Sequence, residues 1–377
     1  MFRTMLHRLR TLFTLHRPSE TSRPSPMEGH SLPWQDTMAA IADLKHMAAE
    51  TPGAVTIHMA LGNLYRAQGD LDQAIHTRYT LLHDPGIGQE HHGRILWELG
   101  RDYKRSGLLD RAQRMYERTQ DIVGPDSVLL QEMADLAAAG GDHARAAHLF
   151  SQVKHPVAQA HHLVQQAKEL ARCGQRDRSA WLLRKALKIS PGSVEAWMTQ
   201  MIQAYEGGNW KRLTHSFQQG LRAVEPRLRF LLLEGLIQHL FTQRSPQDLF
   251  IPILAPETGH ALVQVIEVQE PDVHLAYYGA WIHLQLGHPS KARTLLQKCC
   301  DMEPDFWPAR LELLALYAEE EGLPSHIRNH MESILHLGRQ VKKFVCSKCG
   351  LKLDQIFFQC PRCRTWHSIA FLRNLEA

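Results

Sequence analysis

The 377-residue sequence has no long apolar run and almost no excess of charge. The longest apolar stretch, Phe230 to Phe241, contains Glu234 and His239 and is shorter than the roughly 20 residues that a membrane-spanning helix needs. This stretch predicts a buried helix, and we expect no transmembrane span in this chain. The formal net charge is only +4, so the protein as a whole is not a polycation.

Sequence signatures of catalysis are also missing. The chain has no glycine-rich phosphate loop, no Gly-x-Ser-x-Gly motif and no His-Glu-x-x-His motif. Its 24 histidines are scattered. We expect the pairs His91-His92 and His161-His162 to be solvated helix ends rather than ligands, because adjacent residues on a helix do not face one another. These observations predict a protein that is not an enzyme.

The N-terminal segment lacks the uninterrupted apolar core of a secretory signal, because arginines recur through residues 1–17. Large apolar residues recur there at helical spacing, which predicts a basic amphipathic helix that can lie among anionic lipid headgroups. The alternative is a dispensable leader, or a translation start at Met27. Residues 18–36 are rich in Pro, Ser and Thr and predict a linker.

Seven cysteines are present, and four of them form one pattern with chemical meaning. Cys346-x-x-Cys349 and Cys360-x-x-Cys363 are separated by ten residues. Two such pairs bring four thiolates to one point, and tetrahedral sulfur coordination suits zinc or iron. Two disulfides are the alternative, but a chain without a secretory signal favours a metal site. An all-cysteine set leaves no open position, so the metal is predicted to hold structure.

The choice between iron and zinc stays open. Gly350 and Pro361 resemble the knuckles of rubredoxin, in which backbone N–H groups point at the sulfurs. The loop of ten residues is shorter than in rubredoxin, and Arg364 stands where rubredoxins usually carry glycine, so a zinc ribbon fits equally. Residues 339–377 are too few to fold alone, and we expect this module to need its metal and to dock on the rest of the chain. The other three cysteines lie in helical patterns, which is typical of a reduced, cytosolic protein.

Residues 37–338 carry a repeating helical signature. In the two clearest units a glycine is followed at equal offsets by a tyrosine, a second glycine and an alanine: Gly62, Tyr65, Gly69 and Ala74, then Gly100, Tyr103, Gly107 and Ala112. This pattern resembles the tetratricopeptide repeat, with a small residue where two helices cross and a glycine in the turn. Turn glycines at 141, 174, 208 and 287 mark further copies, whereas residues 227–271 lose the signature. The predicted fold is an all-α tetratricopeptide superhelix followed by a small rubredoxin-like or zinc-ribbon module.

Stacked repeats of this kind form a groove lined by the first helix of each pair, and such grooves bind peptides or protein segments. The groove positions of the two clearest units are Met59, Asn63, Arg66, Trp97, Arg101 and Lys104. The basic side chains suit an acidic segment or a chain-terminal carboxylate, with the Met and Trp as apolar anchors. Ordinary solvated charges are the alternative.

The order of these parts resembles the lipopolysaccharide assembly protein B family over residues 37–377. The most specific matches are Leu61–Arg66, Leu99–Tyr103 and the cysteine pairs with the adjoining Arg364 and Trp366. The resemblance implies a cytoplasmic adaptor at the inner membrane of Gram-negative bacteria. It implies that this adaptor acts with a membrane AAA+ protease to set the level of the deacetylase that commits precursors to lipid A, and that the four cysteines are metal ligands.

One feature departs from that family, whose members begin with a transmembrane helix. Residues 1–17 are too short and too basic to span a bilayer. The sequence therefore leaves anchoring open and predicts reversible, peripheral contact with anionic lipid at the cytoplasmic face of the membrane.

Two other functions fit the C-terminal module alone. Between residues 339 and 373 eight Lys or Arg stand against one acid, Asp354, with aromatic residues between them, as a nucleic-acid-binding zinc ribbon requires. Steep salt dependence of oligonucleotide binding would favour that function over the adaptor. A rubredoxin-type iron would instead carry electrons, and full function with zinc in place of iron would exclude that role.

Overall fold

The computed structural model describes residues 33–51, 54–242, 254–318, 324–339 and 341–372. The predictions of an amphipathic helix in residues 1–17 and of a linker that begins at residue 18 therefore lie largely outside the described residues. The chain divides into a first unit, residues 1–119, and a second unit, residues 120–377, which we describe separately. Among the described helices, none is both long and apolar enough to cross a membrane.

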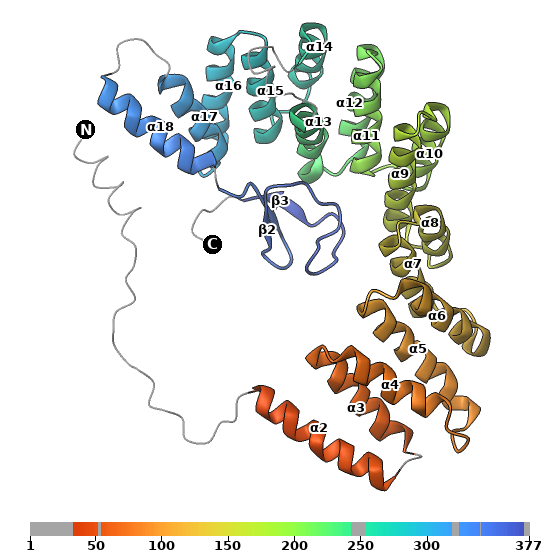
Figure 1. The fold of residues 1–377 in the computed structure, drawn as a ribbon. Helices are drawn as coiled ribbons and strands as arrows, with labels where there is room; N and C mark the ends of the chain where they lie inside the picture. Colours follow the sequence, from red (N-terminus) through yellow and green to blue (C-terminus); the bar gives the residue numbers. More distant parts are fainter. Residues whose placement is uncertain (1–32, 52–53, 243–253, 319–323, 340, 373–377) are drawn as a thin grey trace, which may run out of the picture. The chain divides into compact units, whose positions relative to one another are not determined.

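The first unit consists of helices joined by short turns (Figure 1). They are α2 (Pro33–Glu50), α3 (Val55–Gln68), α4 (Leu71–Leu82), α5 (Gln89–Arg105) and the larger part of α6 (Leu109–Val123). Consecutive helices pack together from α2 to α5. The turn between α3 and α4 depends on Gly69, whose φ of +89° lies in the left-handed region that favours glycine. The start of α2 at Pro33 falls inside the range that composition assigns to a linker.

Glycines in the first unit allow a helix to pack closely against the large side chains of its partner. A Cβ atom on Gly62 would lie 2.8 Å from Cζ of Arg78, and one on Gly100 would overlap the ring of Tyr116. The two contacts occur at the same offset in successive repeats. They confirm that the repeat signature marks the crossing point of two helices.

A buried network of charges links α3, α4 and α5. Arg78 and Asp102 are fully buried and bonded to each other, and Arg66 donates to Asp102 Oδ1 at 3.1 Å and to Glu98 Oε2 at 2.5 Å. The Asn63 Oδ1 atom accepts from both arginines. Burial lowers the pKa of Arg78 and raises that of Asp102, while their mutual attraction opposes both shifts. The network therefore depends on both members of the buried pair being present.

The second unit continues the helical pairs. Its helices are α7 (Ser127–Ala139), α8 (His143–Gln152), α9 (Pro156–Arg172), α10 (Arg176–Ile189), α11 (Val194–Glu206), α12 (Trp210–Ala223), the short η1 (Pro226–Leu228), α13 (Phe230–Thr242), α14 (Pro256–Glu267), α15 (Val273–Gln285), α16 (Pro289–Met302), α17 (Trp307–Ala318) and α18 (Ser325–Arg339). Packing pairs α7 with α8, α9 with α10, α11 with α12, α15 with α16 and α17 with α18. The four predicted turn glycines, 141, 174, 208 and 287, all have positive φ. The all-α tetratricopeptide fold is thus confirmed.

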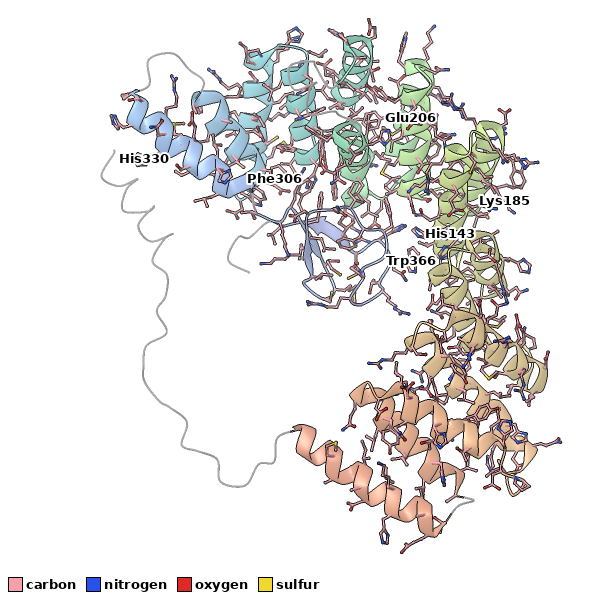
Figure 2. The ribbon with its side chains drawn as sticks, in the orientation of Figure 1. His143, Lys185, Glu206, Phe306, His330 and Trp366 are labelled. Carbon is pink, nitrogen blue, oxygen red and sulfur yellow. The ribbon has the colours of Figure 1, made fainter. Side chains whose placement is uncertain are left out.

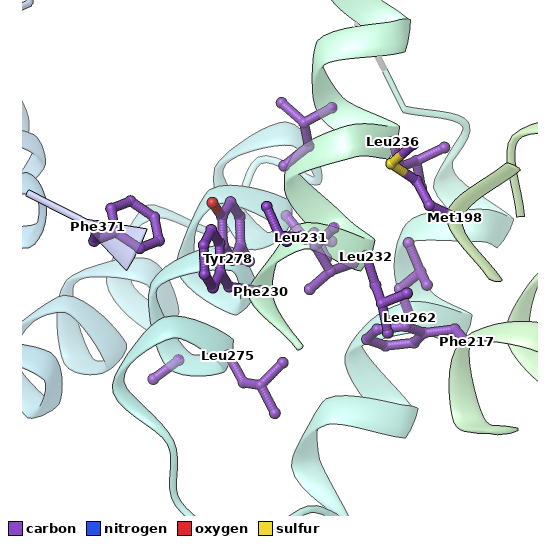
Figure 3. Close-up of a cluster of buried hydrophobic side chains, with 14 of the residues drawn as sticks. Met198, Phe217, Phe230, Leu231, Leu232, Leu236, Leu262, Leu275, Tyr278 and Phe371 are labelled. Atoms are coloured by element: carbon purple, nitrogen blue, oxygen red, sulfur yellow. The ribbon is translucent and has the colours of Figure 1, made fainter. Parts of the chain in front are cut away.

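Helix α13 lies at the centre of the hydrophobic core of the second unit (Figure 3). Nine of its thirteen residues are buried, which confirms that the longest apolar run forms a buried helix. Its leucines share this core with Met198 of α11, Phe217 of α12, Leu262 of α14 and Leu275 of α15. The central helix of the segment that loses the repeat signature is therefore packed on most of its sides.

The chain ends in a small antiparallel sheet with strand order β2-β1-β3. Its strands are β1 (Phe344–Cys346), β2 (Lys352–Leu353) and β3 (Ile369–Phe371). Phe344 pairs with Phe371 in the register of β1 and β3, and both are buried against Phe230 of α13, with ring centroids 6.1 and 4.7 Å away. Figure 1 shows this sheet beside α13. The module is thus joined to the core of the helical array.

Substitution of Asp102 tests the buried charge network. We expect Asp102→Ala to lower the free energy of unfolding by about 3 to 5 kcal/mol, because it leaves the buried Arg78 without its partner. Exposed Asp72→Ala, on α4, is the matched control and should cost less than about 1 kcal/mol. Denaturant unfolding followed by far-UV circular dichroism measures both.

A double variant separates lost charge from lost packing. Arg78→Met with Asp102→Leu removes both charges and should recover most of the stability that Asp102→Ala loses. Equal stability of Asp102→Ala and the control would contradict the network.

Candidate metal centre

The four predicted cysteine ligands come together at the end of the sheet. Their sulfurs all lie within 4.8 Å of one another. The Sγ atoms of Cys346 and Cys363 are 3.7 Å apart, and those of Cys349 and Cys360 are 3.6 Å apart. A tetrahedral ion with metal–sulfur bonds of about 2.3 Å requires sulfur–sulfur separations of about 3.8 Å. The donor set and its spacing therefore fit one metal ion.

Both cysteine pairs have the same backbone turn. The Gly350 N–H donates to the Cys346 carbonyl at 2.9 Å, and the Arg364 N–H donates to the Cys360 carbonyl at 2.8 Å. The residue that closes each turn has positive φ, +71° for Gly350 and +55° for Arg364. Glycine adopts this left-handed conformation freely, whereas arginine pays about 1 kcal/mol for it.

The Arg364 side chain offsets part of that cost. Its Nη1 atom lies 3.2 Å from Oδ2 of Asp135 on α7, in an ion pair between the C-terminal module and the helical array. The arginine side chain is 65% exposed, so solvent limits the pair to at most about 1 kcal/mol. A glycine at this position would relax the turn but lose the contact.

Hydroxyl groups and backbone N–H groups surround the sulfurs. Ser368 Oγ is 3.2 Å from Sγ of Cys346, and Thr365 Oγ1 is 3.3 Å from Sγ of Cys363. Burial opposes ionisation of Cys346, but hydrogen bonds from Ser368 and from the backbone N–H groups of residues 348 and 349 outweigh it and lower its pKa to about 6. The pKa of Cys363 is lowered by Thr365, through its hydroxyl and its backbone N–H. This environment stabilises the thiolates of Cys346 and Cys363, which is the form that binds metal. For Cys349, a backbone hydrogen bond from Leu351 lowers the pKa, but burial and hydrogen bonds with the other three cysteines outweigh it and raise the pKa to about 11.

The module docks on α9 through an aromatic contact (Figure 2). The Trp366 ring lies 5.0 Å from the ring of His161 in an edge-on arrangement, and Nζ of Lys168 lies 6.0 Å above the Phe358 ring. Glu195 of α11 holds both α9 side chains, since it accepts from His161 Nδ1 at 2.6 Å and from Lys168 Nζ at 2.9 Å. Burial opposes the charge on Glu195, but Lys168 and His161 outweigh it and lower its pKa to about 2.

The prediction that His161-His162 is a solvated helix end is wrong. The pair lies in the middle of α9, and His162 is only 6% exposed. Its ring is stacked between Phe150, 5.3 Å away, and His143, 5.5 Å away. Burial lowers the pKa of His162 to about 3, and the neighbouring His161 and His143 add to the shift. His162 is therefore a neutral core residue beneath the docking contact.

A second buried carboxylate joins the module to α13. Glu234 is 4% exposed and accepts from Tyr278 Oη of α15 at 2.6 Å and from Lys343 Nζ at 2.7 Å. Lys343 and Arg364 thus both join the C-terminal module to the helical array. These two of the eight basic residues counted in the module are engaged with Glu234 and Asp135, which reduces the positive charge available to a nucleic acid.

The predicted groove residues have different environments in the first unit. Met59 is 3% exposed and cannot serve as a surface anchor, because it belongs to the core. Asn63 and Arg66 are bonded within the charge network. Trp97 is half-buried with its ring 5.9 Å from that of Tyr116. The remaining two, Arg101 and Lys104, are exposed and half-buried respectively, and Arg101 lies 3.3 Å from Glu98. A partner site at these positions stays a prediction.

Comparison with known proteins finds that the chain is similar to proteins named for lipopolysaccharide assembly. No family model matches it. It is 24% identical over 347 residues to lipopolysaccharide assembly protein B of Escherichia coli (strain K12), with 88% of this chain and 84% of that protein aligned. The protein of the same name from Haemophilus influenzae is 23% identical, with 84% and 79% aligned. The predicted family resemblance is thereby confirmed.

Among solved structures, a tetratricopeptide repeat protein from Parabacteroides merdae covers 79% of this chain and 99% of its own, with a TM-score of 0.34 and 15% identity. The fold assignment rests on the helical pairs and turn glycines described above.

Removal of two ligands tests the metal site. We expect Cys360→Ser with Cys363→Ser to lose the bound metal and to loosen the C-terminal module, while the array stays helical because each repeat contacts only its neighbours. Mass spectrometry of bound metal, far-UV circular dichroism and limited proteolysis measure these effects. Cys173→Ser removes an exposed cysteine elsewhere and is the control. Stoichiometric metal in the double variant would disprove four-cysteine ligation.

Acid should destabilise the docking region through His162. Its folded pKa, about 3, lies below the unfolded value of 6.5, so its contribution is complete above pH 6.5 and is lost as the pH falls toward 3. We expect a loss of about 2 kcal/mol between pH 6.5 and 5. His162→Phe should flatten this dependence, whereas His148→Phe, an exposed site on α8, should retain it. Urea unfolding at several pH values measures the free energy of unfolding of each variant. Identical dependence of this free energy on pH in the two variants would contradict the role of His162.

Proposed function

We propose that this chain is a non-catalytic adaptor in lipopolysaccharide assembly. In this role it couples a membrane AAA+ protease to degradation of the deacetylase that commits precursors to lipid A. The supporting observation is the similarity to proteins named for lipopolysaccharide assembly, which extends over 88% of this chain and 84% of the Escherichia coli relative. A tetratricopeptide scaffold suits such a role, because its surface binds protein segments without chemistry of its own.

The metal centre supports this role by fixing the surface of the array. Four cysteine ligands leave no position for a substrate, so an iron or zinc ion there holds the two turns together. The folded module then covers parts of α9, α13 and α15 through Trp366, Phe344 and Phe371. Loss of the metal would expose those apolar surfaces and change what the array presents to a partner.

We place the partner site of the first unit on α5. Arg101 is 45% exposed at its side chain, and Lys104 follows one turn later with Trp97 one turn earlier. An acidic segment of the protease or the deacetylase would pair with the two basic residues and pack on the indole ring. The chain would act at the cytoplasmic face of the inner membrane, with peripheral attachment through residues 1–17.

The half-life of the deacetylase tests this function. In cells that lack the endogenous gene, we expect the wild-type chain to shorten the half-life, measured by immunoblot after translation arrest. Cys360→Ser with Cys363→Ser should abolish the effect through the metal module. Arg101→Glu with Lys104→Glu should weaken it, because each reversed charge costs roughly 1 to 3 kcal/mol of partner affinity.

Cys173→Ser is the control for expression and should behave as wild type. A half-life that is the same with and without the wild-type chain would disprove coupling to the protease. Full activity of the Arg101 and Lys104 double variant would remove α5 from the partner site but leave the adaptor role standing.

A further inference from the structure

A depression in the second unit has the features of a binding site that the adaptor role does not use. It has a volume of about 610 Å³ and lies where α9 and α11 end and α10 and α12 begin. We call it the Arg172 pocket. Its walls carry Arg172 from α9, Arg176 from α10, Arg212 from α12 and Thr199 from α11.

The residues that line the Arg172 pocket carry more positive than negative charge. All three arginines are exposed, and within the described part of the chain none of them forms an ion pair. The other charged groups are largely engaged: Lys168 is bound to Glu195, and Glu206 lies 3.1 Å from His239. Three guanidinium groups without carboxylate partners outnumber the two acids that line the pocket, Asp177 and Glu206, and therefore favour an anionic ligand.

Two helix N-termini add to this field. The first turns of α10, at Arg176, and of α12, at Arg212, both line the pocket. Asn209 caps α12 through a bond to the Arg212 N–H at 2.9 Å, whereas Gln175 makes no side-chain cap on α10. Helix N-termini present backbone donors and partial positive charge, which stabilise bound anions.

The pocket also contains a polar atom that lacks a partner. Thr199 is 3% exposed, and its Oγ1 has no hydrogen-bond partner among the described atoms. An unsatisfied buried hydroxyl is costly, and most such groups in folded proteins have a partner. A ligand oxygen in the pocket could supply one after a small movement of the side chain.

We propose that the Arg172 pocket binds a phosphate monoester. A phosphate dianion has enough charge and enough acceptor oxygens to engage at least two of the three arginines, whereas a lone carboxylate would leave more of the positive charge unpaired. The volume exceeds that of a phosphate, and the apolar Ala171, Ala180 and Ile202 also line it. These residues leave space for the body of an organic phosphate, which can be a soluble compound or a lipid headgroup.

Calorimetric titration of the full chain tests the pocket, with glucose 1-phosphate as the soluble probe. We expect Arg172→Gln with Arg212→Gln to weaken binding at least about 10-fold, since each arginine makes charge-assisted hydrogen bonds. Arg184→Gln, an exposed arginine on α10 outside the pocket, should bind as wild type. Thr199→Val should weaken binding without lowering the melting temperature, because the hydroxyl has no partner in the free protein.

Vesicles containing phosphatidic acid, which carries a phosphate monoester, form the second arm. Vesicles of equal charge made with phosphatidylglycerol, a diester, control for the basic N-terminal residues. A variant effect on glucose 1-phosphate identifies a soluble ligand, and an effect confined to phosphatidic acid identifies a headgroup.

Three results would overturn the proposal. They are equal affinity of wild type and the double variant for both probes, an equal loss in Arg184→Gln, and tighter binding of a poly-glutamate peptide than of either phosphate. If the double variant has a lowered melting temperature, the single variants Arg176→Gln and Thr199→Val replace it in the same titrations. Wild-type affinity for both probes in both single variants would then overturn the proposal.

Discussion

The packing of Phe344 and Phe371 against Phe230 holds the C-terminal module in place. The sheet is too small to enclose its own core, and these two phenylalanines are buried because α13 and α15 supply the other side. The metal centre fixes the two turns at one end of the sheet, while α13 receives its apolar face. Because the sheet depends on both contributions, we expect metal binding and docking on the array to be coupled.

Two buried carboxylates on array helices reinforce this arrangement from different sides. Glu234 of α13 accepts from Lys343, and Glu195 of α11 holds His161 and Lys168 in place under Trp366 and Phe358. Each carboxylate has several donors, as a buried charge requires. The same geometry places a neutral His162 below the contact. The docking surface therefore combines apolar area with charge pairs that are specific to one orientation of the module.

The sequence predicts the parts of this structure that depend on local pattern. Turn glycines, the crossing-point Gly62 and Gly100, the buried run after Phe230 and the four cysteines each have a fixed backbone or ligand requirement that spacing reveals. Contacts between distant segments leave no such periodic signal. The pattern does not reveal the burial of His162, although the buried Ala158 lies one turn earlier on the same face, because its stacking partners lie on another helix. The pattern likewise predicts a surface position for Met59 and Arg66, because the residues that enclose or bind them come from neighbouring segments.

Arg364 takes part both in the second cysteine turn and in the contact between the C-terminal module and the helical array. As the residue that closes the second cysteine turn, it adopts a left-handed backbone that the metal-binding geometry requires. As a long basic side chain, it reaches Asp135 on α7, which a glycine could not do. The contact of the side chain with α7 therefore offsets part of the conformational free energy that the left-handed backbone costs. Because the same residue shapes the turn and makes the ion pair, the orientation of the Arg364 side chain toward α7 depends on the turn that surrounds the metal.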